Sequence, residues 1–285
     1  MITFAMIDFD KESLNKYSNL FSECFPDASK FSFEYLKWLY CDNPNGRAIG
    51  FDAWDDDQLA AHYVCVPTRV KIRGRECNVL LSLNTATHPK YQGKGLFTKL
   101  AEMTYDAGAS KGFDGIYGVA NANSTPGFVR KLGFQLIEPL EARVGFGALN
   151  INMSNASDIQ FERIWSESSI SWRCNNPNNS VYSHEDEKSI KFSASAMGNG
   201  LPVYAELPKD CAQYKRNIKK NNILSPIRLF IGLTPTGTCS FGSYFNIPQR
   251  FRPSPLNFIY RSLLQDVAPL EQGTISFSFL DFDAY

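Results

Sequence analysis

The chain has 285 residues, of which 44% are hydrophobic and 20% are charged. This composition is typical of an ordered globular protein and excludes a fibrous or disordered one, and the length favours two domains or one large domain. Its 29 basic and 29 acidic residues cancel, so no overall positive field favours nucleic acid or an anionic membrane as a partner.

The sequence of residues 1–149 predicts a mixed series of strands and helices. Runs rich in β-branched and aromatic residues are typical of strands, and amphipathic runs that end at Pro or Gly are typical of helices. The predicted elements are a strand over 2–9, helices over 11–25 and 32–41, strands over 48–54, 58–72 and 77–88, a helix over 96–112, a strand over 115–120, a helix over 123–134 and a strand over 141–149. The three central strands suggest an antiparallel meander.

The second half repeats two phrases of the first. Trp38 and the segment Cys41–Asn45 are matched by Trp172 and the segment Cys174–Asn178, again after a helix-like run over 161–174. Later, YQGKGL is matched by FRPSPL, in which both glycines have become prolines. We therefore predict an internal repeat, with domains over 1–148 and 149–285 and the second a degenerate copy of the first. Chance similarity of the second pair is the alternative.

Cysteines and histidines argue against a metal site and a disulfide framework. The seven cysteines are scattered without a Cys-x-x-Cys pair, and the three histidines form no His-Glu-x-x-His run. The amino terminus carries acidic residues early and no sustained apolar run, unlike a signal peptide or a membrane helix. We predict a cytoplasmic protein with no metal and with no nucleic-acid or membrane partner.

A glycine pair lies between a predicted strand and a predicted helix, in the segment THPKYQGKGLFTKLAEM. Backbone N–H groups in such a turn can bind an anion, because the positive end of the helix dipole lies behind them. Gly93 and Gly95 allow close approach of a phosphate or a positive φ, and nearby lysines supply positive charge. A plain glycine turn with solvated lysines is the alternative.

Two kinds of phosphate loop do not match this segment. No Gly-Lys-Ser/Thr sequence is present, so the hydroxyl that binds magnesium in a P-loop is missing. Thr98 stands where a dinucleotide-binding loop has its third glycine. The sequence therefore argues against a nucleoside triphosphatase and against a Rossmann dehydrogenase.

The segment HPKYQGKGLFTKLAEM, followed by VANANSTPGFVRKLGF, resembles the GNAT superfamily of acyl-CoA-dependent N-acyltransferases. The family's pyrophosphate loop reads Gln/Arg-x-x-Gly-x-Gly/Ala, and Gln92–Phe97 matches it except that Phe97 replaces the last small residue. The family's later helix begins near an asparagine and ends in Leu-Gly-Phe, as Asn123 and Leu132–Phe134 do. Phe97 raises the question of how the end of the loop packs.

The resemblance implies an α/β fold of the GNAT type, with a mixed and splayed central sheet, and acyl-CoA as co-substrate. It implies that the loop backbone binds the CoA pyrophosphate, that the strand before it lines the pantetheine arm, and that Asn121 or Asn123 contacts the cofactor. Helix capping is the alternative role of these asparagines. The implied cofactor-binding residues are Thr85, Thr87, Gln92, Gly93, Lys94, Gly95, Leu96, Phe97, Asn121 and Asn123.

The acid and the base are less clear than the cofactor loop. Val129 occupies the position of the tyrosine acid of many family members, and the run 77–88 has no carboxylate of the kind that many use as a base. Strand alternation places Ser82 and Asn84 on one face, and His62 lies on the preceding strand, where its imidazole could reach an amine through a water molecule.

We predict His62, Asn84 and Tyr63 as catalytic residues, and a buried structural histidine is the alternative for His62. The further candidates are Tyr40, His88, Tyr91 and the terminal carboxylate of Tyr285.

The predicted acyl acceptor rests only on the resemblance to members of the GNAT superfamily. The loop and the tandem layout look similar to superfamily members that acylate nucleotide-linked amino sugars of the dTDP-3-amino-3,6-dideoxyhexose type for surface polysaccharide. Aminoglycosides, polyamines and peptide amines are alternative acceptors, and a CoA-sensing module without turnover is the alternative function. The basic run over 209–222 is either a solvated helix face or a phosphate-binding patch. The predicted oligomeric state is a monomer or a homodimer.

Overall fold

The computed structural model describes residues 1–26, 30–152, 158–185, 187–196, 201–209, 226–252 and 254–282. The chain forms two compact units, and each is described by itself. The first comprises Met1–Thr68, Asn78–Leu136 and Ile259–Val267, and the second comprises Arg69–Cys77, Ile137–Phe258 and Ala268–Tyr285. The segments of the two units alternate along the chain and so do not test the predicted domain boundary at residue 148. That boundary remains a prediction based on the internal repeat.

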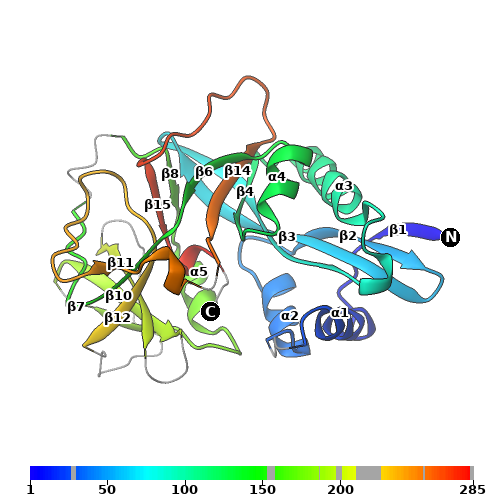
Figure 1. Ribbon diagram of the computed structural model, residues 1–285, viewed down its shortest axis with the longest axis horizontal. Coiled ribbons are helices and arrows are strands. Elements are labelled where there is room, and N and C mark those ends of the chain that lie inside the picture. The colour runs from blue at the N-terminus through cyan, green and yellow to red at the C-terminus, as the bar shows by residue number, and fades with distance from the viewer. Residues whose placement is uncertain are drawn as a thin grey trace. The chain divides into compact units, whose positions relative to one another are not determined.

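Up to residue 131 the first unit has the predicted order of elements, and Figure 1 labels them. The strand predicted over 141–149 forms over Glu141–Phe146 and belongs to the second unit. The helices of the first unit are α1 (Lys11–Cys24), α2 (Phe33–Tyr40), the 3₁₀ turn η1 (Pro89–Tyr91), α3 (Leu96–Ser110) and α4 (Thr125–Lys131). Its strands are β1 (Ile2–Met6), β2 (Ile49–Asp55), β3 (Gln58–Ile72), β4 (Arg75–Thr87), β5 (Gly115–Ala120), β6 (Gln135–Pro139) and β14 (Asn257–Ser262). The last residues of β3 and β6 and the first residues of β4 and β14 belong to the second unit.

Local sequence explains the helices α1 and α2. The Asp10 carboxylate accepts a hydrogen bond from the Ser13 N–H at 2.7 Å, and the Ser32 hydroxyl accepts one from the Tyr35 N–H at 3.2 Å. Such side chains satisfy N–H groups that a helix leaves open at its start. One face of α1 is buried, and its buried side chains are Leu14, Tyr17, Leu20 and Phe21.

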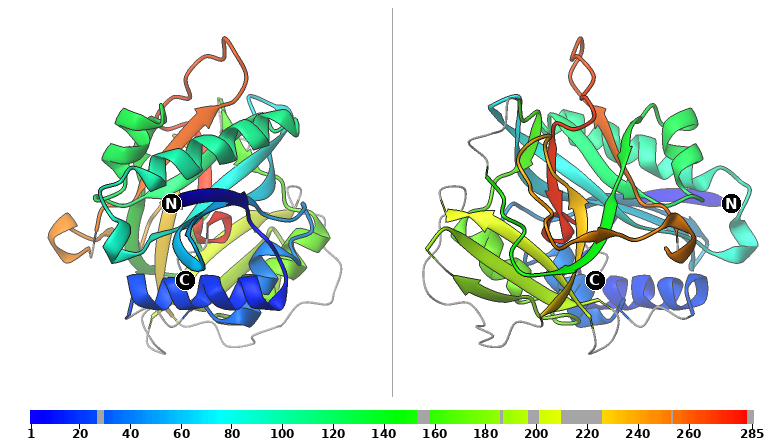
Figure 2. Two further views of the ribbon diagram at one scale, coloured as in Figure 1. Left: turned by 90° about the vertical axis from the view of Figure 1, so that its right-hand side faces the viewer. Right: turned by 60° about the vertical axis from the view of Figure 1, so that its left-hand side comes forward.

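The sheet of the first unit is mixed. Strand β2 pairs antiparallel with β1 and with β3, β4 lies next to β3, and β5 pairs parallel with β4. Strand β14, from near the end of the chain, lies next to β5, and the Leu263 N–H donates to the Asp114 carbonyl at 2.9 Å. Helices α1 and α2 cover one face of this sheet, and α3 and α4 cover the other (Figures 1 and 2).

Strands β4 and β5 stop pairing before they end. Their paired residues run from Val79 with Gly115 to Ser82 with Gly118, whereas β4 continues to Thr87 and β5 to Ala120. Within β4, Asn84 has a φ of 47°, a left-handed conformation that a non-glycine residue adopts only at some cost. The sheet therefore opens at Asn84, as the predicted splay requires.

The second unit is mainly β structure. Its elements are β7 (Glu141–Phe146), β8 (Phe161–Arg163), α5 (Glu167–Cys174), β9 (Tyr182–Glu185), β10 (Ser189–Ser195), β11 (Pro202–Pro208), β12 (Ile227–Leu233), β13 (Phe245–Asn246), η4 (Gln249–Phe251), β15 (Ile275–Ser278) and η5 (Phe279–Asp281). Strand β10 pairs antiparallel with β9 and with β11, β12 pairs with β7, β11 and β15, and β15 pairs parallel with β8.

Two predictions for the second half concern the helix-like run over 161–174 and the basic run over 209–222. The run 161–174 was predicted as helix-like throughout, but its first residues form β8 and only Glu167–Cys174 is helical, because the Ser166 hydroxyl caps the helix at the Ser169 N–H. The basic run over 209–222 lies, except for Lys209, outside the described residues. Among the helices of the described ranges, none has both the length and the apolar character needed to cross a membrane.

Candidate active site

The predicted cofactor loop connects β4 to α3 in the first unit. Both glycines are left-handed, with a φ of +76° at Gly93 and at Gly95, and a Cβ atom at either position would meet nothing within 4 Å. Gly95 is the N-cap of α3, and no side chain caps this helix. The N–H groups at the start of a 15-residue helix therefore stay available for an anion.

Side chains from neighbouring segments hold the loop in place. The Tyr91 hydroxyl donates to Asp55 Oδ2 at 3.1 Å, and the Lys94 ammonium lies 4.8 Å from the centre of the Tyr91 ring. The His88 Nδ1 accepts a hydrogen bond from the Lys90 N–H at 3.2 Å, and its Nε2 lies 3.0 Å from a Glu23 carboxylate oxygen. These contacts give His88 and Tyr91 a role in fixing the loop.

The structure shows how Phe97 fits at the end of the loop. Its ring lies edge-on to Phe128 at 5.3 Å and to Tyr63 at 5.9 Å, centre to centre. A Cβ atom on Gly127 of α4 would be 3.1 Å from Phe97 Cε1. The absent side chain of Gly127 thus makes room for the large residue at position 97.

Replacing Gly127 by valine is therefore expected to lower the free energy of unfolding by about 2 kcal/mol, because overpacking and a β-branched residue in a helix both cost stability. Urea denaturation measures this loss of stability. In a Phe97→Leu background, the loss caused by Gly127→Val should fall to about half. Equal losses in both backgrounds would contradict the contact between Gly127 and Phe97.

The other predicted cofactor-binding residues lie around the same opening. Thr85 and Thr87 are half-buried at the end of β4, and Gln92 Nε2 donates to the Thr87 carbonyl at 3.4 Å. Asn121 Oδ1 accepts hydrogen bonds from the N–H groups of Asn123 and Ser124, each at 3.0 Å, so it caps the turn before α4. Asn123 is exposed. Their contacts with a cofactor stay predictions.

His62 is fully buried, at 0% exposure, and belongs to a chain of hydrogen bonds between the sheet and helices α1 and α2. Its Nδ1 lies 2.6 Å from Asp52 Oδ1, and the other oxygen of Asp52 accepts from the Tyr17 hydroxyl at 2.9 Å. A carboxylate only accepts hydrogen bonds, so His62 Nδ1 donates and Nε2 is the acceptor. The carboxylate thus fixes the tautomer of the imidazole.

Tyr40 connects His62 to the opening of the sheet. Its hydroxyl lies 3.1 Å from His62 Nε2 and accepts a hydrogen bond from Asn84 Nδ2 at 3.2 Å. Tyr40 is itself buried, and burial raises the pKa of its hydroxyl above the ordinary value. Tyr40 therefore joins His62 to Asn84 by hydrogen bonds.

The prediction that Ser82 and Asn84 share one face of their strand is wrong. The Ser82 hydroxyl lies 2.6 Å from the Tyr63 hydroxyl, on the side of α3, whereas Asn84 bonds to Tyr40 on the side of α2. The left-handed φ of Asn84 interrupts the alternation. This residue therefore turns toward the histidine.

Tyr63 belongs to a separate buried network. Its hydroxyl lies 2.7 Å from the Tyr105 hydroxyl of α3 in addition to its contact with Ser82, and the Cys65 thiol donates to it at 3.6 Å. Burial raises the pKa of Cys65 to about 12, so this thiol stays protonated at neutral pH. The catalytic role of Tyr63 stays a prediction.

Asp52, the carboxylate partner of His62, is not among the predicted site residues. Strands β2 and β3 pair antiparallel with Asp52 opposite His62, so counting back from the turn at Asp56 would approach the partner. A register shift between Ala53 and Trp54 offsets that count by one residue. A simple hairpin count would therefore have placed the wrong residue opposite His62.

The comparisons with known proteins agree with this geometry. Residues 7–137 match the family model described as an acetyltransferase (GNAT) domain. No curated protein is significantly similar in sequence to the chain.

Solved structures are similar in fold. A GCN5-related N-acetyltransferase from Anabaena variabilis has a TM-score of 0.56 and 10% identity over 91% of this chain and 72% of its own. A probable N-acyltransferase from Enterococcus faecalis has a TM-score of 0.55 and 13% identity over 92% and 73%. A GNAT family acetyltransferase from Brucella melitensis, in complex with acetyl-CoA, has a TM-score of 0.38 and 18% identity over 47% and 83%.

The matched region contains the cofactor loop, the opened sheet and the buried histidine. This region has a mixed α/β fold similar to that of GNAT acetyltransferases. The match over residues 7–137 supports an enzyme of the acyl-CoA-dependent transferase class.

Proposed function

We propose that the chain is an N-acyltransferase that transfers an acyl group from acyl-CoA directly to a primary amine in its first unit. The observation that carries this proposal is the uncapped start of α3, with left-handed Gly93 and Gly95, next to the end of the pairing between β4 and β5. The loop N–H groups would bind the pyrophosphate of CoA, and the opened sheet would take its pantetheine arm. No metal is part of the proposal.

The transfer needs an attack by a neutral amine. The amine nitrogen forms a bond to the thioester carbonyl carbon, the carbon–sulfur bond breaks, and the thiolate of CoA leaves and takes up a proton. The proton that the amine loses must go to a base. In the first unit, Cys65 and Ser82 are buried, and each is hydrogen-bonded to Tyr63. Neither is therefore placed to form an acyl-enzyme, which supports direct transfer.

His62 is the proposed base, and Tyr40 carries the proton to it. The Tyr40 oxygen would accept the proton of the amine while Tyr40 passes its own proton to His62 Nε2. Asp52 would stabilise the imidazolium that forms, because an opposite charge at 2.6 Å favours the charged state. Asn84 is the half-buried member of this chain and would contact the reacting groups.

The proposed acceptor is a nucleotide-linked amino sugar of the dTDP-3-amino-3,6-dideoxyhexose type. This proposal is based on the sequence of the loop and on the predicted repeat. One feature of the structure supports a repeat: Asn43 Oδ1 accepts from the Asn45 N–H at 3.0 Å, and Asn176 Oδ1 accepts from the Asn178 N–H at 2.9 Å. Both asparagines are buried. The two matched phrases therefore fold into the same kind of turn.

The second pair of matched phrases agrees in part. A 3₁₀ turn precedes each phrase, with Tyr91 N–H donating to the His88 carbonyl and Phe251 N–H donating to the Pro248 carbonyl. Among the described residues between this turn and β14, which begins at Asn257, none is helical. The second copy would therefore bind no pyrophosphate, and one CoA site per chain is proposed.

A panel of acyl-CoA donors and amine acceptors tests this function through the release of free CoA thiol. Thiol release with the dTDP-linked amino sugar, and not with an aminoglycoside, a polyamine or a peptide, is the expected result. Release with one of the other three amines would replace the proposed acceptor. CoA binding without release from any donor and acceptor would favour a CoA-sensing module.

A further inference from the structure

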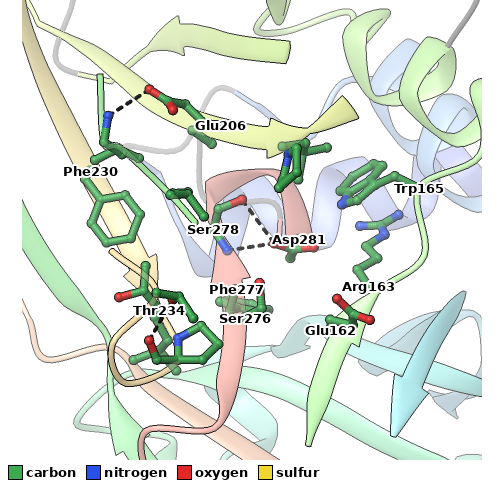
Figure 3. A pocket seen from close by; sticks show the side chains of 18 residues that line it. Glu162, Arg163, Trp165, Glu206, Phe230, Thr234, Ser276, Phe277, Ser278 and Asp281 are labelled. Carbon is green, nitrogen blue, oxygen red and sulfur yellow. Dashed lines mark hydrogen bonds between the residues drawn. The ribbon is translucent and has the colours of Figure 1, made fainter. Parts of the chain in front are cut away.

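The second unit has a cavity of about 50 Å³ among β8, β11, β12, β15 and η5. A water molecule needs roughly 10–15 Å³ measured in this way, so the cavity holds about four groups of that size. This is room for a charged head group and a few carbon atoms. Figure 3 shows its walls.

Acidic groups predominate among the charged residues that line the cavity. They are three carboxylates, Glu162, Glu206 and Asp281, and a single guanidinium, that of Arg163. The guanidinium lies 4.0 Å from the centre of the Trp165 ring, on the face of that ring. Glu162 is paired with Lys71 at 3.4 Å, and Asp281 interacts with Arg163 and Arg173, so Glu206 is the carboxylate of the lining that is left to a cationic ligand.

The position of Asp281 is fixed by its own helix turn. Its Oδ2 accepts hydrogen bonds from the Ser278 N–H at 2.6 Å and from the Ser278 hydroxyl at 3.1 Å, as Figure 3 shows. Only 4% of the residue is exposed, and burial raises the pKa of its carboxyl group. The guanidinium groups of Arg163 and Arg173 lower this pKa in turn, so cations of the chain itself offset part of the cost of burying the Asp281 carboxylate.

The position of Glu206 is fixed by two donors that share one oxygen. Its Oε1 accepts from the Leu149 N–H at 2.8 Å and from the Tyr204 hydroxyl at 2.5 Å. Glu206 is 8% exposed and lines the cavity. Among the described residues both of its hydrogen bonds end on Oε1, which leaves Oε2 to a ligand.

The remaining walls suit an alkyl chain next to the charge. Phe230, Leu233 and Phe277 are buried apolar side chains of the lining, and Thr234 and Ser276 add hydroxyl groups. Carboxylates beside aromatic and aliphatic walls are a setting that favours an organic ammonium ion. We propose that this cavity of the second unit binds the alkylammonium group of an organic amine.

Calorimetric titration of the full chain, without CoA, tests the site with n-butylamine, n-butanol and butyrate as probes at pH 7.5. The amine should bind at least tenfold more tightly than the alcohol, and butyrate should not bind. Glu206→Gln keeps an acceptor for Leu149 and Tyr204 and should weaken amine binding at least tenfold, because a hydrogen bond to a charged group is lost. Asp281→Asn should weaken it less, because Arg163 and Arg173 already interact with Asp281.

Glu185→Gln is the matched control, because it removes the same charge from an exposed strand residue of the second unit that does not line the cavity. Its affinity for the amine should equal that of the unmodified chain. Equal binding of n-butanol and n-butylamine, or unchanged affinity in Glu206→Gln, would overturn the proposal. Because CoA is absent, failure of this site and failure of acyl transfer are separate results.

A second arm identifies the source of the amine. With acyl-CoA added, thiol release that depends on n-butylamine, together with a raised KM for the amine in Glu206→Gln, would assign the cavity to the acyl acceptor. Binding without thiol release would assign it to an amine that the second unit binds for another purpose. Either outcome supports the ammonium site, which the two binding results named above can overturn.

Discussion

Gly95→Asp is expected to lower the affinity for CoA at least 100-fold. The new carboxylate would stand at the start of α3, where the proposed pyrophosphate binds, and two like charges about 4 Å apart near a protein surface repel by roughly 4 kcal/mol. Adding a Cβ atom causes no clash, since nothing lies within 4 Å, so the fold should survive. Titration with CoA measures the affinity, and circular dichroism checks the fold.

Two control variants separate charge from backbone strain. Gly95→Asn has the size of aspartate without its charge, and asparagine tolerates a positive φ, so it should keep CoA affinity within about tenfold. Gly112→Asp introduces the same residue at another left-handed glycine, beyond the far end of α3, where a Cβ atom also meets nothing. It should bind CoA normally. Unchanged affinity in Gly95→Asp would contradict the phosphate-binding role of the loop.

Tyr40→Phe is expected to lower kcat about 100-fold and to leave the KM for acyl-CoA within about twofold. The substitution removes the hydroxyl that joins Asn84 to His62, and general acid–base catalysis contributes typically 10²-fold or more. The phenylalanine ring keeps the packing against Tyr17 and His62. Initial rates over a range of pH measure the effect, and the limb due to the base should disappear from the profile.

His62→Gln should show the same loss of kcat, and the double variant should be no worse than either single one, because both residues belong to one proton path. Tyr63→Phe is the comparison, since its hydroxyl contacts Ser82 and Tyr105 instead. A large loss in Tyr63→Phe with normal turnover in Tyr40→Phe would move the acid–base role to Tyr63. Losses that simply add would contradict a shared path.

Local patterns predicted the first unit well because they act over short distances. The bounds of β3 and β5 are those that the sequence analysis predicted, and the caps at Asp10 and Ser32 lie where the helix signals begin. Strands β6 and β14 were missed. Strand β14 lies next to β5 from about 140 residues further along the chain, a pairing that no periodicity in one sequence reveals.

The site was predicted unevenly for the same reason. The loop at Gly93 and Gly95 is a contiguous motif, whereas the partners of His62 come from β2 and α2. Position 84 is left-handed but is an asparagine and not a glycine, so the sequence gives no signal of this conformation. The conformation nevertheless decides toward which face of the sheet the Asn84 side chain points. The room that Gly127 makes for Phe97 likewise depends on the contact between two helices.

The most direct test of the account is a mass balance on one reaction. The unmodified chain is incubated with acyl-CoA and an accepted amine, and free thiol and acylated amine are both quantified. One acylated amine is expected for each thiol released, and at an acyl-CoA concentration near the KM of the unmodified chain Gly95→Asp should form almost none of either product. Thiol release without an acylated amine, or full product formation by Gly95→Asp, would contradict it.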